Sequence, residues 1–199
     1  RLQVEHPVTE MITGQDLVEW QLRVAGGEEL PLNQEQIRIN GHALEARIYA
    51  EDPANDFLPA SGTLTFLQPP EESDHVRVDT GVLQGDEVSV YYDPMIAKLV
   101  VWDEDREKAL RRLTKALTEY RIAGMATNID FLYNLVCCEA FKRAEVDTGF
   151  IEKHHDEIFS YNQQDISQAV ALAALYLVLE QAKKAEIRAT HFPDPWSPW

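Results

Sequence analysis

The chain has 199 residues, of which 45% are hydrophobic, and this is enough for one ordered core and an appended element. Its formal net charge of −16 disfavours nucleic acids and anionic membranes as partners, because both polyanions would repel it. We expect no transmembrane segment or signal peptide, and the two cysteines are too few for a disulfide framework and favour a reducing compartment.

The first predicted helix runs from Thr9 to about Ala25. Thr9 is a suitable capping residue, and apolar residues recur after it at spacings of three and four. The pair Gly26-Gly27 then ends the helix. The segment before the helix opens with Arg1 and has no initiator methionine, so we expect the chain to be part of a longer protein.

The middle of the chain alternates strands with turns before it becomes helical. Strands are predicted over residues 42–50, 62–68, 76–79, 87–91 and 95–102. The next helix, from Asp105 to about Glu119, would carry one apolar face made of Ala109, Leu113, Ala116 and Tyr120. This pattern is typical of the α+β fold class.

Helices are also predicted in the last third of the chain. One begins at residue 127 or 128 and ends at about 141, and a short one spans residues 149–153. A polar stretch without periodicity, residues 160–164, marks a boundary. An alanine- and leucine-rich helix over 165–187, capped by Asp165, follows it.

Arg1, Gln3 and Glu5 form the first candidate site. In an extended segment, residues two apart project to the same face, so these three side chains would line one wall. A guanidinium binds an anion bidentately, an amide orients it and a carboxylate accepts a proton, which suits a small acidic oxyanion such as bicarbonate. The competing interpretation is an ordinary surface ion pair between Arg1 and Glu5.

Arg47 is the second candidate. Alternation between apolar and polar residues over 42–51 predicts that Arg47 and Glu45 share one face of a strand. A fixed guanidinium aimed at a developing oxyanion can contribute roughly 3–4 kcal/mol to catalysis. Two interpretations remain open: Arg47 is such a donor, with Glu45 orienting it, or the two residues form only a strand-surface pair.

Four segments occur in order and connect these candidates. They are R-L-Q-V-E-H-P-V-T-E-M-I-T-G from residue 1, G-H-A-L-E-A-R-I-Y-A-E-D-P from residue 41, F-L-P-A-S-G from residue 57 and Y-Y-D-P-M-I-A-K-L from residue 91. From Arg1 to about His155 the chain closely resembles the biotin carboxylase component of biotin-dependent carboxylases. The resemblance implies the end of an ATP-grasp region over 1–40 and a biotin carboxylase C-terminal domain over 41–158.

That family makes carboxyphosphate from ATP and bicarbonate, and its breakdown to CO2 and phosphate allows N1 of biotin to be carboxylated. The resemblance implies that Glu5 is the general base on bicarbonate, and that Arg1, Gln3 and the Val4 amide bind this anion. It also implies that Arg47 stabilises negative charge on the ureido oxygen of biotin. Biotin, ATP and Mg2+ are the implied cofactors. Most ATP and metal ligands would lie outside this chain, so the fragment is expected to be inactive alone.

Asp93 precedes a turn proline and the apolar strand that begins at Met95, in which Lys98 is expected to face outward. Two interpretations of Asp93 are open: it contacts the biotin pocket or Arg47, or it caps local backbone amides as a turn aspartate. We find no spacing typical of metal ligands or of a nucleophilic triad, so no metal site is predicted.

The region 159–199 resembles the start of the segment that links biotin carboxylase to the biotin carrier in acyl-CoA carboxylase alpha chains. Its proline-tryptophan tail is most similar to that of 3-methylcrotonyl-CoA carboxylases. The implied partners are a biotin carrier domain and a carboxyltransferase beta subunit, which the helix over 165–187 would contact. Alternatively, that helix packs on sequence that follows this chain.

The family also implies a homodimer or a larger hetero-oligomer, with Arg77 matching an interface arginine. The implied location is the cytoplasm in a bacterium or the mitochondrial matrix in a eukaryote. Two alternatives stay open for function. One is the biotin carboxylase subunit of a propionyl-CoA, geranyl-CoA or acetyl-CoA carboxylase, and the other is a non-catalytic dimerisation module.

Overall fold

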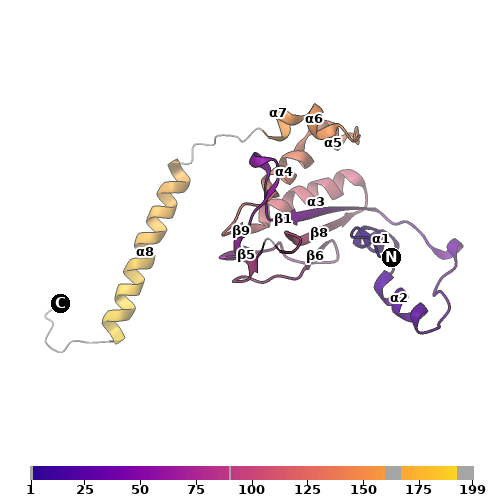
Figure 1. Ribbon diagram of the computed structural model, residues 1–199, viewed down its shortest axis with the longest axis horizontal. Coiled ribbons are helices and arrows are strands. Elements are labelled where there is room, and N and C mark those ends of the chain that lie inside the picture. Colours follow the sequence, from indigo (N-terminus) through magenta and orange to yellow (C-terminus); the bar gives the residue numbers. More distant parts are fainter. Residues whose placement is uncertain (1, 90, 160–166, 192–199) are drawn as a thin grey trace. The chain divides into compact units, whose positions relative to one another are not determined.

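The computed structural model describes residues 2–89, 91–159 and 167–191, with the side chains of 167–169 and 188–191 excepted. The chain divides into two units, residues 1–160 and 161–199 (Figure 1). The described strands and helices α1 to α7 belong to the first unit, and α8 belongs to the second. Among the described residues, no helix is both long enough and apolar enough to cross a membrane.

A three-stranded antiparallel sheet forms the centre of the first unit. Its order is β1 (His42–Tyr49), β8 (Met95–Asp103) and β6 (Val76–Thr80), so that β8 is the central strand. Directly opposed residues in such a sheet lie on the same face. Because Lys98 opposes both Arg47 and Asp79, one face of the sheet carries charged side chains.

The other face of the sheet is apolar and packs against α3 (Arg106–Glu119). As predicted, Ala109, Leu113, Ala116 and Tyr120 are buried there. The helix begins where expected, because the side chain of Asp105 accepts a hydrogen bond from the Lys108 amide at 2.8 Å. The main core therefore lies between α3 and the sheet.

Two helices replace the single helix predicted from Thr9 to Ala25: α1 (His6–Thr13) and α2 (Leu17–Ala25). Gly14 ends α1 in the left-handed region at φ 68°, and the Asp16 side chain then caps α2 by accepting a hydrogen bond from the Glu19 amide. Helix α1 starts earlier than predicted because Pro7 fits its first turn. It lies against β1 and β8 on the charged face of the sheet.

Short two-stranded ladders replace two of the longer predicted strands. The strand predicted over 62–68 is β4 (Gly62–Thr63) and β5 (Phe66–Gln68), separated by two residues, and the one over 87–91 is described only as β7 (Glu87–Val88). The pairs are β4 with β7, β5 with β9 (Arg121–Ala123), and β2 (Glu51–Asp52) with β3 (Leu58–Pro59). Two 3-10 turns complete this part, at Gln34–Gln36 and Pro53–Asn55.

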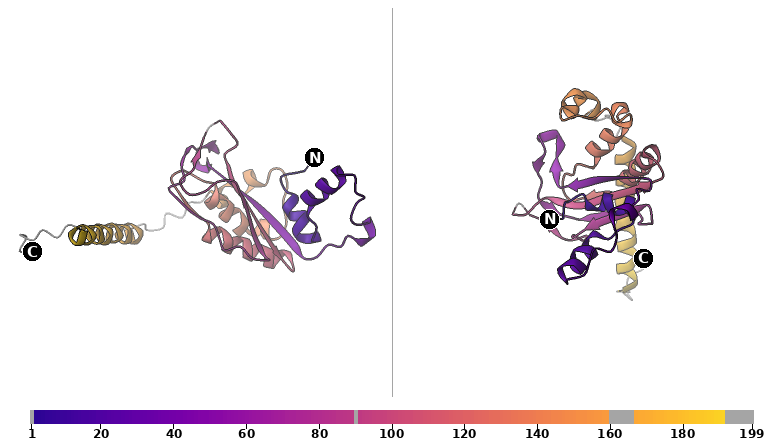
Figure 2. Two further views of the ribbon diagram at one scale, coloured as in Figure 1. Left: turned by 90° about the horizontal axis from the view of Figure 1, so that it is seen from below. Right: turned by 90° about the vertical axis from the view of Figure 1, so that its right-hand side faces the viewer.

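The helix predicted to end near residue 141 is interrupted at Cys138, whose backbone is not helical (φ −59°, ψ 129°). It consists of α4 (Ile129–Cys137) and α5 (Glu139–Lys142), which are followed by α6 (Phe150–Lys153) and α7 (His155–Ile158). A second small core forms around Phe131, Cys138, Phe150 and Ile158. In Figure 2 (right) these orange helices and the indigo α2 lie on opposite sides of the strands.

Helix α8 (Ser167–His191) makes up the described part of the second unit. Its large apolar side chains are exposed within the described residues, Leu172, Tyr176 and Leu179 among them. The predicted cap Asp165 and the tail 192–199 lie outside the described residues.

Candidate functional site

A layer of charged side chains lies between α1 and the sheet. The sheet contributes Glu45 and Arg47 from β1, Arg77 and Asp79 from β6, and Lys98 from β8, and the segment of α1 contributes Glu5 and Glu10. These groups form two sets of ion pairs. Arg47 joins Glu5 and Glu45 in one set, and the other runs from Glu10 through Arg77 and Asp79 to Lys98. Most of the candidate residues predicted from the sequence are in or beside this layer.

Glu5 and Arg47 meet although 42 residues separate them in the sequence. Nη2 of Arg47 donates to Oε2 of Glu5 at 3.2 Å, and both side chains are open to solvent, 40% and 59% exposed respectively. Nη1 of Arg47 makes no hydrogen bond with the described residues, which leaves a donor for an incoming oxyanion. A proton acceptor and a fixed cation are therefore adjacent and accessible.

The segment that carries Glu5 is a turn and not the extended wall expected from the sequence. Val4 and Glu5 are the turn residues, and the His6 amide donates to the Gln3 carbonyl at 3.3 Å. The alternation of side chains that an extended segment imposes is lost, because α1 already begins at His6. Glu5 still points to Arg47, and Arg1 lies outside the described residues.

Glu45 holds Arg47 from the side of the strand. Nε of Arg47 donates to Oε1 of Glu45 at 3.3 Å, and the Glu45 side chain is only 6% exposed. Its Oε2 is buried without a hydrogen-bond partner among the described residues. Burial raises the pKa of Glu45, and the hydrogen bond and charge of Arg47 offset this only in part. The shared face is confirmed, and Arg47 contacts both Glu45 and Glu5.

Asn128 fixes the backbone of β1 on both sides of Ile48. Its Nδ2 donates to the Arg47 carbonyl at 3.0 Å, and its Oδ1 accepts from the Tyr49 amide at 2.9 Å. The residue is 5% exposed and lies where the register of β1 against β8 shifts, between Ile48 and Tyr49. Sequence reasoning treated residue 128 only as a helix start, so this contact to Arg47 was missed.

Lys98 lies on the polar face of β8. It was expected to face outward, but its side chain does not extend freely into solvent. Its side chain is 14% exposed, and Nζ lies 3.2 Å from Oδ2 of Asp79 and 3.4 Å from the Val4 carbonyl. Burial alone would raise the pKa of Asp79, but hydrogen bonds from Arg77 and Lys98 hold it below its ordinary value. Lys98 thus connects β6 to the turn that carries Glu5.

Arg77 ties β6 to α1 within this chain. It donates to both carboxylate oxygens of Asp79, at 2.6 and 2.9 Å, and through Nη1 to Oε2 of Glu10 at 2.7 Å. The other oxygen of Glu10 accepts from the Leu17 amide at 2.9 Å, at the start of α2. Each of these contacts is internal, and the role of Arg77 in a dimer interface remains a prediction.

Asp93 behaves as a turn residue. Its Oδ1 accepts a hydrogen bond from the Met95 amide at 2.9 Å, as in the second of the two interpretations. No ion pair joins it to Arg47 among the described residues.

A cluster of residues of the types that bind metals lies outside the charged layer. The ligand atoms of Cys138, His154 and Glu157 are within 4.8 Å of one another.

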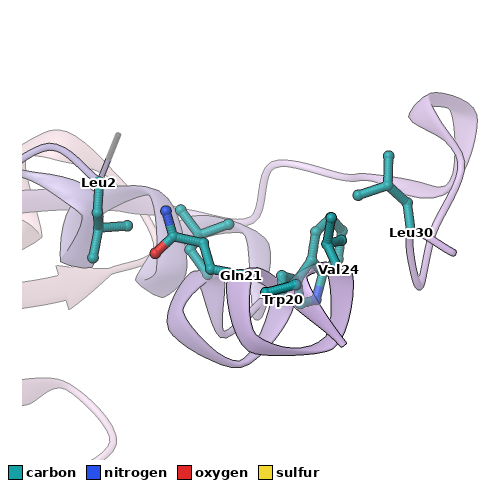
Figure 3. Close-up of a pocket in the computed structure, with 7 residues that line it drawn as sticks. Leu2, Trp20, Gln21, Val24 and Leu30 are labelled. Atoms are coloured by element: carbon teal, nitrogen blue, oxygen red, sulfur yellow. The ribbon is translucent and has the colours of Figure 1, made fainter. Parts of the chain in front are cut away.

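An apolar depression of about 530 Å³ lies apart from this charged layer, along α2. Figure 3 shows Trp20, Gln21 and Val24 of α2 between Leu2 and Leu30. Leu17 and Ala25 complete its lining, which contains no ionisable side chain. It therefore lacks the proton acceptor and the cation that make the layer around Arg47 chemically capable.

Two family models match the chain. The model described as the biotin carboxylase C-terminal domain covers residues 45–153, and the one described as the carbamoyl-phosphate synthase L chain ATP binding domain covers residues 1–33. The N-terminal match includes the turn at Glu5, and the longer match includes Glu45, Arg47 and Lys98. The Glu5–Arg47 contact thus joins two regions that separate family models describe.

Curated relatives match over the whole chain. The mitochondrial methylcrotonoyl-CoA carboxylase subunit alpha of Dictyostelium discoideum is 56% identical, and that of Rattus norvegicus is 52% identical. Both matches cover 100% of this chain but 28% of the relative. The chain therefore spans little more than a quarter of the length of these relatives.

Solved structures share the fold. The biotin carboxylase domain dimer of Hydrogenobacter thermophilus 2-oxoglutarate carboxylase, in complex with MgADP, ADP and bicarbonate, matches with a TM-score of 0.77 and 44% identity, over 79% of this chain and 35% of that one. The biotin carboxylase subunit of a pyruvate carboxylase matches with a TM-score of 0.79 and 41% identity, over 82% of this chain and 36% of that one.

Proposed function

Because the chain belongs to the biotin carboxylase C-terminal domain family, as its four motifs indicated, we propose that it is a segment of a biotin-dependent acyl-CoA carboxylase alpha subunit. The longer polypeptide that contains this segment, called the parent below, would carboxylate biotin with ATP and bicarbonate. The observation that carries the proposal is the 3.2 Å contact between Glu5 and Arg47. The methylcrotonoyl-CoA carboxylase relatives favour 3-methylcrotonyl-CoA as the final acceptor.

Bicarbonate suits the groups beside Arg47. Glu5 can accept the proton that bicarbonate loses when it attacks a phosphoryl group, while Val4 and Gln3, with Arg1, would hold the anion. Glu5 and Arg47 contact each other at 3.2 Å, which leaves no space for an anion between them unless binding widens this contact. We expect bicarbonate to bind at Nη1 of Arg47, which has no hydrogen-bond partner among the described residues, or in the space that this widening opens.

Arg47 would act again in the second step, on biotin. Removal of the N1 proton places negative charge on the ureido oxygen, and the Arg47 guanidinium can stabilise this charge. Glu45 holds the guanidinium at Nε, and Asn128 fixes the strand backbone at the Arg47 carbonyl. The breakdown of carboxyphosphate supplies CO2 and phosphate: the phosphate would accept the N1 proton, and the new bond joins N1 to the carbon of CO2. ATP and Mg2+ would be held mainly by the rest of the parent.

We further propose the division into the end of an ATP-grasp region (1–40), a biotin carboxylase C-terminal domain (41–158) and the start of a linking region (159–199). A biotin carrier domain and a carboxyltransferase beta subunit would be the partners, and the parent would form a dimer or a larger oligomer with Arg77 near the interface. The mitochondrial relatives favour the matrix as the location in a eukaryote, and the bacterial counterpart would be cytoplasmic.

Carboxylation of free biotin by the parent tests the proposal, with bicarbonate-dependent ATP cleavage followed in parallel. Wild type should carry out both reactions, and Arg47→Ala should lose biotin carboxylation by about two to three decades while it keeps more of the ATP cleavage. Equal losses in both reactions would make Arg47 a structural residue. A wild-type parent without either activity would favour the non-catalytic dimerisation module instead.

A further inference from the structure

Lys98 occupies the middle of the central strand and has no role in the proposed reaction. A lysine whose side chain is 14% exposed loses most of its hydration, and this is unfavourable unless the ammonium finds polar partners. Lys98 finds two partners: the carboxylate of Asp79 at 3.2 Å and the backbone carbonyl of Val4 at 3.4 Å. The second contact reaches across 94 residues of sequence to the turn that carries Glu5.

Lys98 and Arg47 act on this turn together. They oppose each other directly on β8 and β1, and they contact consecutive residues: Lys98 the carbonyl of Val4 and Arg47 the carboxylate of Glu5. Packing fixes the turn only in part, because Val4 is 38% exposed. The polar contacts therefore help to hold it against the sheet.

The Val4 carbonyl is an effective point at which to hold the turn. The peptide unit is planar, so fixing this carbonyl fixes the plane that ends at the Cα of Glu5. The same plane sets the direction from which the Glu5 side chain approaches Arg47. This unit also carries the Glu5 amide, and at the Cα of Val4 it joins the peptide unit whose Val4 amide faces bicarbonate in the proposed function.

We propose that Lys98 is a positioning residue for bicarbonate: it holds the Val4–Glu5 turn against the sheet, and Asp79 anchors its ammonium group. This inference rests on the proposed function. Asp79 keeps both hydrogen bonds to Arg77 when the ammonium is removed, so loss of the Lys98 charge does not leave an unpaired buried carboxylate. The effect of a substitution at Lys98 should therefore be concentrated at the turn.

The test uses the parent as wild type, Lys98→Met, Lys98→Arg and the control Lys115→Met. Methionine keeps most of the apolar stem and removes the charge, and Lys115 has an exposed ion pair with Glu119 on α3, away from the turn. Lys98→Met should raise the KM for bicarbonate in ATP cleavage about tenfold, as expected for one lost charged hydrogen bond. The KM for ATP should change little, Lys98→Arg should restore part of the loss, and Lys115→Met should behave as wild type.

Amide hydrogen exchange of the same proteins gives a second measurement that needs no turnover. The amides of His6 and Val8 donate to the Gln3 and Glu5 carbonyls, so a looser turn in Lys98→Met should exchange faster at these two positions. Lys98→Gln replaces Lys98→Met if the latter does not accumulate as folded protein.

An unchanged bicarbonate KM together with unchanged exchange would overturn the inference. So would a uniform fall of all rates with a lower Tm, because this is the signature of a purely structural lysine. A wild-type parent without bicarbonate-dependent ATP cleavage would reject the proposed function separately. The exchange comparison would then still decide whether Lys98 holds the turn.

Discussion

Glu45 accepts a hydrogen bond from Nε of Arg47 at 3.3 Å, and this carboxylate is almost completely buried while the guanidinium is open to solvent. Arg47 is thus held at Nε, while its terminal nitrogens face Glu5 and the solvent. A flexible exposed arginine would lose rotational freedom when it binds a ligand. Glu45 removes part of that freedom in advance, which is the arrangement expected of a preorganised charge.

Replacing Glu45 by glutamine should lower the rate of biotin carboxylation by the parent about tenfold, because a neutral amide holds Arg47 less strongly. Bicarbonate-dependent ATP cleavage should fall less, since it depends on Glu5. Burial raises the pKa of Glu45, so its charge disappears at a higher pH than that of an ordinary glutamate. The ratio of the wild-type to the Glu45→Gln rate of biotin carboxylation should therefore approach one as pH falls. A ratio independent of pH would contradict this role.

Glu5→Gln should abolish bicarbonate-dependent ATP cleavage by the parent, with a loss of about 100-fold or more, because an amide cannot accept the proton. The folded structure should survive, since the Glu5 side chain is exposed and its one described ion pair is with Arg47. Glu29→Gln, at an exposed carboxylate that is not part of the layer, is the matched control. Near-normal turnover by Glu5→Gln would remove Glu5 from the mechanism.

Asn128→Ala should destabilise the 199-residue chain by about 2 kcal/mol, because the Tyr49 amide and the Arg47 carbonyl both lose a buried partner. Urea unfolding measures this change. Asn55→Ala removes an exposed hydrogen bond to Asp52 and should cost less than about 0.5 kcal/mol. Equal effects of the two substitutions would mean that Asn128 is not needed to hold β1.

Local periodicity was sufficient to predict much of the fold. The apolar face of α3, the strands β1 and β8, and the shared face of Glu45 and Arg47 follow from spacing alone, because each depends on neighbours within a few residues. The break between α1 and α2 carried local signals as well, in Gly14 and Asp16. The apolar pattern on both sides of the break concealed these signals, since it continues with nearly helical spacing.

The contacts that complete the site were beyond this reasoning. Asn128 reaches Arg47 across 81 residues and Lys98 reaches Val4 across 94, and a single sequence contains no periodic signal for either contact. Glu5 and Arg47 were assigned to the same reaction, but their direct contact was not predicted. The sequence pattern does not determine how α1 packs on the sheet, and this packing brings these groups together.

Gly124→Ala should be strongly destabilising. Its φ of +119° is unfavourable for alanine, and a Cβ there would lie 1.9 Å from the Thr63 carbonyl oxygen, so backbone must move. We expect a loss of about 3 kcal/mol or more in urea unfolding of the chain. Two controls separate the causes: Gly85→Ala has a positive φ but open space and should cost about 1 kcal/mol, and Gly81→Ala should be nearly neutral. Equal losses at Gly124 and Gly85 would exclude the steric contribution.

Asp79 should make the stability of the chain depend on pH. Its pKa is lower in the folded state than its ordinary value, because hydrogen bonds from Arg77 and Lys98 outweigh its burial. A lowered folded pKa stabilises the chain above the unfolded pKa, and this stabilisation is lost as pH falls through the folded pKa. The Tm of wild type should therefore fall as the pH drops below about 4, and the Tm of Asp79→Asn should be lower at neutral pH and fall less over that acid range. Asp74→Asn, at an exposed carboxylate, is the control and should show the same dependence of Tm on pH as wild type. If the Tm of Asp79→Asn falls with pH as steeply as that of wild type, Asp79 is not the cause of the loss of stability in acid.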